Sequence, residues 1–180
     1  MTSDARTNTS KLLQMGQFVV LCLVFPMGYG LESDQSQPIN IRADSGVIDD
    51  GAGKSTYQGN VSIDQGTLLI TAELVEIYME NRDPVRIVAT GNPETLAHYQ
   101  QVPEPGEEPV MANASEIIYF IQEERLVLTG SAKISQLADF FAGDEIRYDI
   151  AAGVINANTT SGRGQVRMTI SPRADPDPDS

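Results

Sequence analysis

The fold is indicated by a segment that the chain contains twice, YQGNVSI at residues 57–63 and LTGSAKI at residues 128–134. Each copy has glycine third, then a small polar residue, then apolar residues at every second position. The copies begin at 57 and 128, so they lie 71 residues apart, and the same offset relates AELVEI at 72–77 to GDEIRY at 143–148. Because two separate elements share one offset, the sequence predicts a fold built from repeated strand units.

The second element occurs twice more, as ADSGVI at residues 43–48 and ASEIIY at residues 114–119. Between these elements apolar and polar residues alternate, and the alternating runs are bounded by Gly, Asn, Asp and Pro. This is the pattern of strands and turns, and helical periodicity is nearly absent after residue 31. Stacked copies of one β unit bury a continuous apolar interior that no single copy could bury alone. We therefore expect an all-β, antiparallel fold.

The first thirty residues differ from the rest of the chain. A weakly basic start at Arg6 and Lys11 precedes an apolar run over residues 12–27 and the small pair Gly28 and Gly30. This order is typical of a secretory signal peptide, which predicts cleavage near Gly30 and export to the periplasm. The alternative is an N-terminal membrane anchor that is not cleaved. We expect residues 31–170 to form one domain and the acidic tail, residues 171–180, to be disordered.

Charge and composition exclude several classes of function. The formal net charge of −13 gives the chain no electrostatic footprint for nucleic acid. His98 is the only histidine, and no nucleophile or metal-ligand spacing accompanies it. GAGKS at residues 51–55 lacks the first glycine of a phosphate-binding loop and precedes a strand, so it is expected to be a turn. We therefore predict no enzyme activity, no cofactor and no metal site.

Several short segments resemble one known family. These are QPINI at 37–41, YQGNV at 57–61, QGTLLITA at 65–72, GNP at 91–93 and VLTGSA at 127–132. In this order and spacing they are similar to the LptA (OstA-like) family over roughly residues 37–170. The resemblance implies a twisted antiparallel β-jellyroll with an open apolar groove, open at both ends and along a seam.

The resemblance also implies a function. It implies a periplasmic carrier of lipopolysaccharide that bridges the inner and outer membranes and holds the acyl chains of lipid A in the groove. The expected partners are an LptC-like protein at the inner membrane, an LptD-like protein at the outer membrane, and further copies of the chain joined end to end.

Fourteen residues are predicted to contact lipid. The resemblance places Ile39, Ile41 and Leu96 at groove positions. Alternation along the strands adds Ile48, Val61, Ile63, Leu68, Ile70, Val75, Ile77, Ile117, Tyr119, Ile146 and Tyr148. The same residues would be ordinary core in a closed β-sandwich, and the sequence does not separate the two. Two further hypotheses stay open, an anchored LptC-like adaptor and a structural β-repeat module with a dry core.

Overall fold

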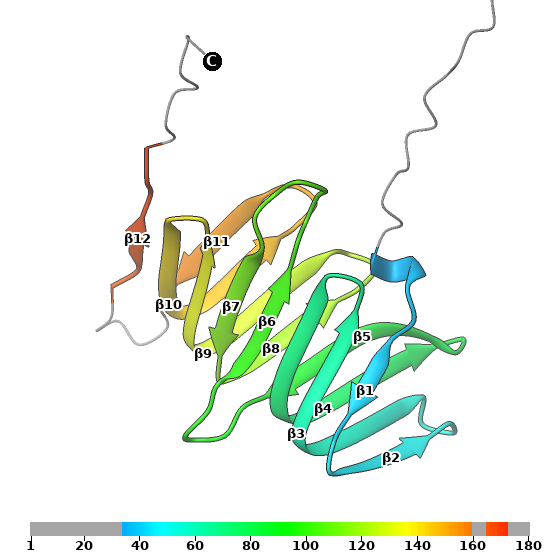
Figure 1. The fold of residues 1–180 in the computed structure, drawn as a ribbon. Coiled ribbons are helices and arrows are strands. Elements are labelled where there is room, and N and C mark those ends of the chain that lie inside the picture. The colour runs from blue at the N-terminus through cyan, green and yellow to red at the C-terminus, as the bar shows by residue number, and fades with distance from the viewer. Residues whose placement is uncertain (1–33, 160–164, 173–180) are drawn as a thin grey trace, which may run out of the picture. The chain divides into compact units, whose positions relative to one another are not determined.

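The structure is a computed structural model, and it describes residues 34–159 and 165–172. In these ranges the chain forms one short 3₁₀ helix and twelve strands (Figure 1). The elements are η1 (Asp34–Ser36), β1 (Asn40–Arg42), β2 (Ser45–Asp49), β3 (Lys54–Gln65), β4 (Leu68–Glu80), β5 (Asp83–Thr90), β6 (Ala97–Gln101), β7 (Val110–Ala114), β8 (Glu116–Phe120), β9 (Arg125–Gln136), β10 (Asp139–Asp149), β11 (Val154–Asn158) and β12 (Arg167–Thr169).

Every strand pair is antiparallel, and four long strands bend so that their two halves pair with different neighbours. The bend in β3 lies at a register shift between Gln58 and Val61, and the bend in β10 at a shift between Gly143 and Glu145. The strands β4 and β9, which pair with these two, are divided at the same level. The bends fold the sheet into two layers, which confirms the predicted all-β jellyroll.

The two layers follow from the pairing. Layer 1 contains β2, β5, β8, β11 and the halves of the long strands at residues 54–58, 74–80, 125–129 and 145–149. Layer 2 contains β1, β6, β7, β12 and the halves at residues 61–65, 68–72, 132–136 and 139–143. The layers are continuous at the bends. On the opposite side they end in separate turns, and this open side is called the seam below.

The predicted repeat is present in three dimensions. β1–β4 and β7–β10 correspond at the 71-residue offset, and by their pairing β5 and β6 correspond to β11 and β12 at offsets of 68 and 69 residues. β3 begins at Lys54 and β9 at Arg125, while their last residues are Gln65 and Gln136. The side chain of Gln65 donates to the Gln37 carbonyl oxygen at 3.0 Å, and that of Gln136 donates to the Glu108 carbonyl oxygen at 3.0 Å. The two halves of the domain therefore share this hydrogen bond as well as their strands.

Glycine is required at the bends of β3 and β9. Gly59 and Gly130 have φ angles of 82° and 76°, which favour glycine. A Cβ on Gly59 would collide with the Asp44 carboxylate, and a Cβ on Gly130 would lie 2.8 Å from the Ser115 hydroxyl oxygen. The repeated glycine of the sequence thus marks the place where each long strand passes from one layer to the other.

The ends of the chain are described only in part. The predicted signal peptide, residues 1–30, and the tail from residue 173 lie outside the described residues. Ser171, the first residue of the predicted tail, donates its backbone N–H to the Asp139 carboxylate at 2.8 Å. In residues 34–159 and 165–172, no helix has the length and apolar character needed to cross a bilayer.

Candidate functional site

The inner faces of both layers carry rows of apolar side chains that run across the strands from one edge of the domain to the other. Residues in a row are direct cross-strand partners. The row of layer 2 is Ile41, Ile63, Ile70, Tyr99, Ala112, Ile134, Phe141 and Met168. A row of layer 1 is Ile48, Ser55, Ile77, Ile87, Tyr119, Leu126, Tyr148 and Ile155.

The space between the layers is closed on one side and open on the other. At the bends the layers share continuous backbone, and in layer 2 small residues pair across strands there, as in Ala97–Ala114 and Ala132–Gly143. At the seam the layers end in separate turns. The interior between them is called the wedge below, and its buried residues are apolar except for Ser55 and Gln65.

Most of the predicted lipid-contacting residues lie in this interior. Ten have exposed fractions of 0–5 %, namely Val61, Ile63, Leu68, Ile70, Val75, Ile77, Ile117, Tyr119, Ile146 and Tyr148. Ile39 and Ile41 are partly buried and pack against the same cluster. The side chains themselves fill the space between the layers, so the use of these positions by lipid stays a prediction.

Two predicted residues lie apart from the others. Ile48 belongs to the inner row of layer 1, but it is 67 % exposed because β2 is an edge strand with no strand beyond it. Leu96 is half-buried and lines a cavity of about 290 Å³ beside the bends, together with Asn60, Val61 and Thr95. Leu96 therefore lies beside the apex of the wedge, while Ile48 lies at its N-terminal end.

Sequence reasoning missed several interior residues. Ile134 lies 71 positions after Ile63, so the repeat could have identified it. Ile87 and Ala89 are buried and alternate with half-buried neighbours, so they carried a usable signal as well. Tyr99, the largest fully buried side chain of the described residues, was missed beside the Pro-rich segment at residues 103–109, although Ala97 and Tyr99 alternate with the polar His98 and Gln100.

Polar groups collect where the interior meets the seam. The rings of Tyr99 in layer 2 and Tyr119 in layer 1 meet edge to face, with centroids 5.7 Å apart. The Tyr99 hydroxyl donates to the Gln101 side-chain oxygen, and the Gln101 side-chain nitrogen donates to the Asp34 carboxylate at 2.8 Å. Burial raises the pKa of Tyr99 well above its ordinary value and that of Tyr119 to about 12. Both phenols are therefore protonated at physiological pH.

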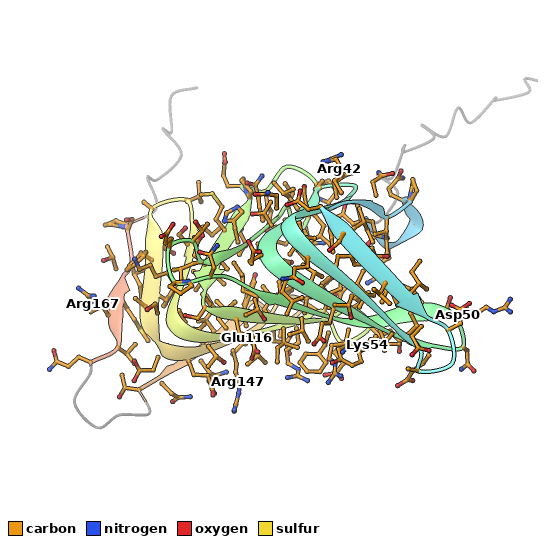
Figure 2. All side chains as sticks on the ribbon, turned by 90° about the horizontal axis from the view of Figure 1, so that it is seen from below. Arg42, Asp50, Lys54, Glu116, Arg147 and Arg167 are labelled. Carbon is orange, nitrogen blue, oxygen red and sulfur yellow. The ribbon has the colours of Figure 1, made fainter. Side chains whose placement is uncertain are left out.

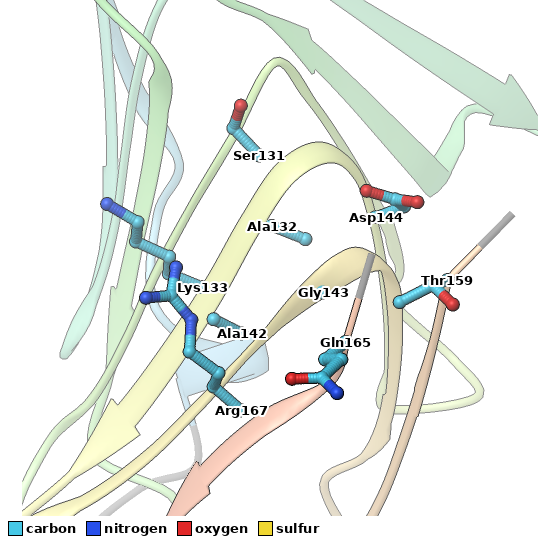
Figure 3. A pocket seen from close by; sticks show the side chains of 9 residues that line it. All are labelled: Ser131, Ala132, Lys133, Ala142, Gly143, Asp144, Thr159, Gln165 and Arg167. Atoms are coloured by element: carbon cyan, nitrogen blue, oxygen red, sulfur yellow. The ribbon is translucent and has the colours of Figure 1, made fainter. Parts of the chain in front are cut away.

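The outer faces are charged. Figure 2 shows the labelled charged side chains, among them Lys54 and Arg147, pointing away from the interior. A cavity of about 670 Å³ lies outside β9, β10 and β12, and Lys133 and Arg167 extend along one side of it (Figure 3). Its lining is mostly polar, so it does not suit an acyl chain. The apolar wedge is the better candidate for a lipid-binding site.

Comparison with known proteins tests the resemblance. Residues 40–154 match the family described as LptA/(LptD N-terminal domain) LPS transport protein. The chain belongs to this family. Among LptA-family relatives, the lipopolysaccharide export system protein LptH of Pseudomonas aeruginosa is 33% identical over 154 residues, which is 82% of this chain and 86% of LptH. LptA of Haemophilus influenzae is 30% identical, covering 89% of this chain and 90% of that protein.

A solved LptA-family structure has the same fold. The crystal structure of LptH, described as the LptA-homologous periplasmic component of the lipopolysaccharide transport device of P. aeruginosa, superposes with a TM-score of 0.70 at 32% identity. The match covers 78% of this chain and 100% of that one. The resemblance seen in the sequence is thus confirmed: the chain is an LptA-like lipopolysaccharide transport protein, and transport by this family is a carrier role.

Proposed function

We propose that this protein holds the acyl chains of lipid A between its two layers and so carries lipopolysaccharide across the periplasm, from the inner to the outer membrane. The observation that supports this most is the pair of apolar rows, which run from edge to edge of the domain without a charged residue. Each buried methylene contributes about 0.8 kcal/mol, so one long acyl chain gains several kcal/mol in such an environment. The carrier needs no catalytic group for this role.

Lipid would enter from the seam. The layers share continuous backbone at the bends, whereas at the seam, in residues 34–159 and 165–172, they end in separate turns and meet through side chains and η1. Widening the wedge at the seam therefore exchanges contacts between interior side chains for contacts with the lipid, and it breaks no strand pairing. The phosphorylated headgroup stays outside, where it avoids burial of its charge.

The repeat supports end-to-end assembly of copies. Inside the chain, β5 of the first half pairs with β8 of the second, and β6 pairs with β7. By the repeat, β11 corresponds to β5 and β12 to β6, while β2 corresponds to β8 and β1 to β7. The strands β11 and β12 form one end of the domain, and β1 and β2 form the other. A second copy can therefore add its β1 and β2 there in the way that the two halves already join.

This correspondence sets the register of the proposed joint. Ile155 pairs with Tyr148 as Ile87 pairs with Ile77, and Ile87 also pairs with Tyr119, so Ile155 should pair with Ile48 of the next copy. Met168 pairs with Phe141 as Tyr99 pairs with Ile70, and Tyr99 also pairs with Ala112, so Met168 should pair with Ile41 of the next copy. Ile48 and Met168 are 67 % and 54 % exposed, and the joint would cover both. Unpaired edge strands with apolar residues are typical sites of strand addition.

The same two ends are proposed to bind the membrane partners, an LptC-like protein at one membrane and an LptD-like protein at the other. If residues 12–30 were retained as an anchor, the chain would instead be an LptC-like adaptor. N-terminal sequencing of the exported protein separates these proposals, since a mature start near Leu31 leaves no anchor.

Photo-crosslinking in cells tests the proposed lipid site. A photoreactive residue replaces Ile41, whose side chain packs against the interior, and in a matched control it replaces Arg42, which is exposed. We expect a lipopolysaccharide adduct at Ile41 and a much weaker one at Arg42. Equal or absent adducts at both positions would favour the structural module with a dry core.

A further inference from the structure

A short segment crosses the seam near the middle of the domain. Asp34 binds layer 2: its carboxylate accepts hydrogen bonds from the Thr67 backbone N–H at 2.7 Å, the Thr67 hydroxyl at 2.6 Å and the Gln101 side chain at 2.8 Å. Gln35 binds layer 1: its side-chain nitrogen donates to the Ile121 carbonyl oxygen and to the Glu124 carboxylate, both at 3.3 Å. Figure 1 shows η1 beside the turn between β8 and β9. Residues 34–36 are called the strap below.

The fold itself does not depend on these bonds. By the repeat, residues 105–107 of the second half correspond to the strap, and the matching bonds of Gln65 and Gln136 show that the chain then follows the same path. Pro105 and Gly106 stand where the first half has Asp34 and Gln35, so their side chains cannot make hydrogen bonds. One half of the domain thus reaches the same strand arrangement without a strap of this chemistry.

Asp34 and Gln35 hold the strap through polar contacts. None of its three residues is buried, so no apolar anchor secures it. The three bonds of Asp34 to layer 2 are 2.6–2.8 Å long, whereas the two bonds of Gln35 to layer 1, one of which is also to a carboxylate, are 3.3 Å long. Hydrogen bonds to an ionised group are the stronger kind when they are short and well aligned. A force that separates the layers should therefore break the contacts of Gln35 first.

Lipid loading would supply such a force. Directly under the strap, Tyr99 of layer 2 and Tyr119 of layer 1 are in contact and only 1 % and 3 % exposed. An acyl chain lying between the layers has to part these two rings, and the strap spans the same two layers at that point. Once the rings are apart, the strap cannot hold both Thr67 and Glu124.

We propose that the strap is a detachable closure of the seam, which stays on layer 2 through Asp34 and releases layer 1 when an acyl chain occupies the interior. This inference rests on the proposed lipid-carrying function. The strap would keep the interior shut in the empty protein, and its contacts with layer 1 would compete directly with lipid. Removing those contacts should speed loading, while release of lipid already bound should be unaffected.

The first test measures loading kinetics with fluorescently labelled lipopolysaccharide in a stopped-flow instrument. Gln35→Ala removes the two side-chain bonds of Gln35 to layer 1, and Gln122→Ala, a change at an exposed glutamine of the β8–β9 turn, is the matched control. We expect Gln35→Ala to raise the association rate by up to about tenfold, the factor that corresponds to ~1.4 kcal/mol. The dissociation rate should stay within twofold of wild type, and Gln122→Ala should match wild type in both rates.

A second test locks the strap. Gln35→Cys and Glu124→Cys, in a Cys22→Ser background, are joined by a short bifunctional methanethiosulfonate that dithiothreitol removes. We expect the joined protein to load lipid several-fold more slowly and to recover after reduction. Unchanged loading in both the Gln35→Ala and the joined protein would overturn the strap inference while leaving the carrier proposal intact. Absence of lipid binding by the wild-type protein would overturn both.

Discussion

At the scale of single residues, Tyr99 combines the two properties of the interior. Its ring fills the wedge, and its hydroxyl ends in the polar cluster at the seam, where Gln101 accepts its hydrogen bond. The hydroxyl can donate this hydrogen bond only while it is protonated. Burial also disfavours the charged phenolate. This makes the protonation state of one interior side chain a determinant of stability.

The raised pKa of Tyr99 predicts a loss of stability in alkali. A tyrosine whose pKa is higher in the folded state stabilises the fold fully below its unfolded pKa, which is 10.0, and progressively less as the pH rises above it. We expect Tyr99→Phe to lower the free energy of unfolding by about 1 kcal/mol at pH 7, through loss of a hydrogen bond. Urea unfolding at pH 7, 9 and 11 should show this deficit shrinking or reversing at pH 11. A deficit that is constant over this range would contradict the assignment.

At the scale of elements, the bent strands decide the architecture. A straight β3 or β9 would extend one flat sheet, whereas a bend lets each strand contribute to both layers. The bend depends on a glycine with positive φ and on a neighbour that leaves no room for a Cβ, Asp44 at Gly59 and Ser115 at Gly130.

Alanine at a bend should therefore cost more than alanine at another positive-φ glycine. Gly130→Ala imposes backbone strain and a clash with Ser115, while Gly153→Ala, at φ 64°, imposes strain alone because no atom lies within 4 Å of the added Cβ. Strain of this kind costs about 1–3 kcal/mol. We expect Gly130→Ala to exceed Gly153→Ala by at least about 1 kcal/mol in urea unfolding, a typical cost of overpacking. Adding Ser115→Gly should recover part of the difference; equal losses for both alanine variants would count against the close-packed bend.

The strands were more predictable than the contacts between them. Alternation and the repeat predicted an all-β fold and ten interior residues, because burial of one face is written locally with period two. The exposure of Ile48 was not predictable in this way, since its alternation does not show that β2 lies at an edge. The strap was hidden for a similar reason, because Gln35 meets partners 86 and 89 residues away and has no local pattern.

At the scale of the whole molecule, the two ends of the domain are complementary because the two halves are alike. The end formed by β11 and β12 presents edge strands equivalent to β5 and β6, which pair with the second half inside the chain. The end formed by β1 and β2 presents edge strands equivalent to β8 and β7, which pair with the first half. The proposed joint can be tested by its register, independently of any lipid.

Cysteine pairs test the register of the proposed joint. Ile48→Cys with Ile155→Cys, in a Cys22→Ser background, places two thiols directly opposite each other across the joint, at a separation that suits a disulfide. We expect mild oxidation to produce covalent multimers on non-reducing gels. The control pair, Val47→Cys with Ile155→Cys, points its thiols to opposite faces of the layer and should remain largely monomeric. Multimers that form equally from both pairs would exclude the proposed register.

The duplicated halves have a consequence for the movement of lipid along an assembled series of copies. If each joint between copies repeats the junction between the two halves of a chain, a lipid that moves along the series encounters the same kind of junction each time, twice per chain. Transfer from one copy to the next would then resemble movement from the first half of a copy to its second half. The route could be lengthened copy by copy without adding a special barrier at any crossing.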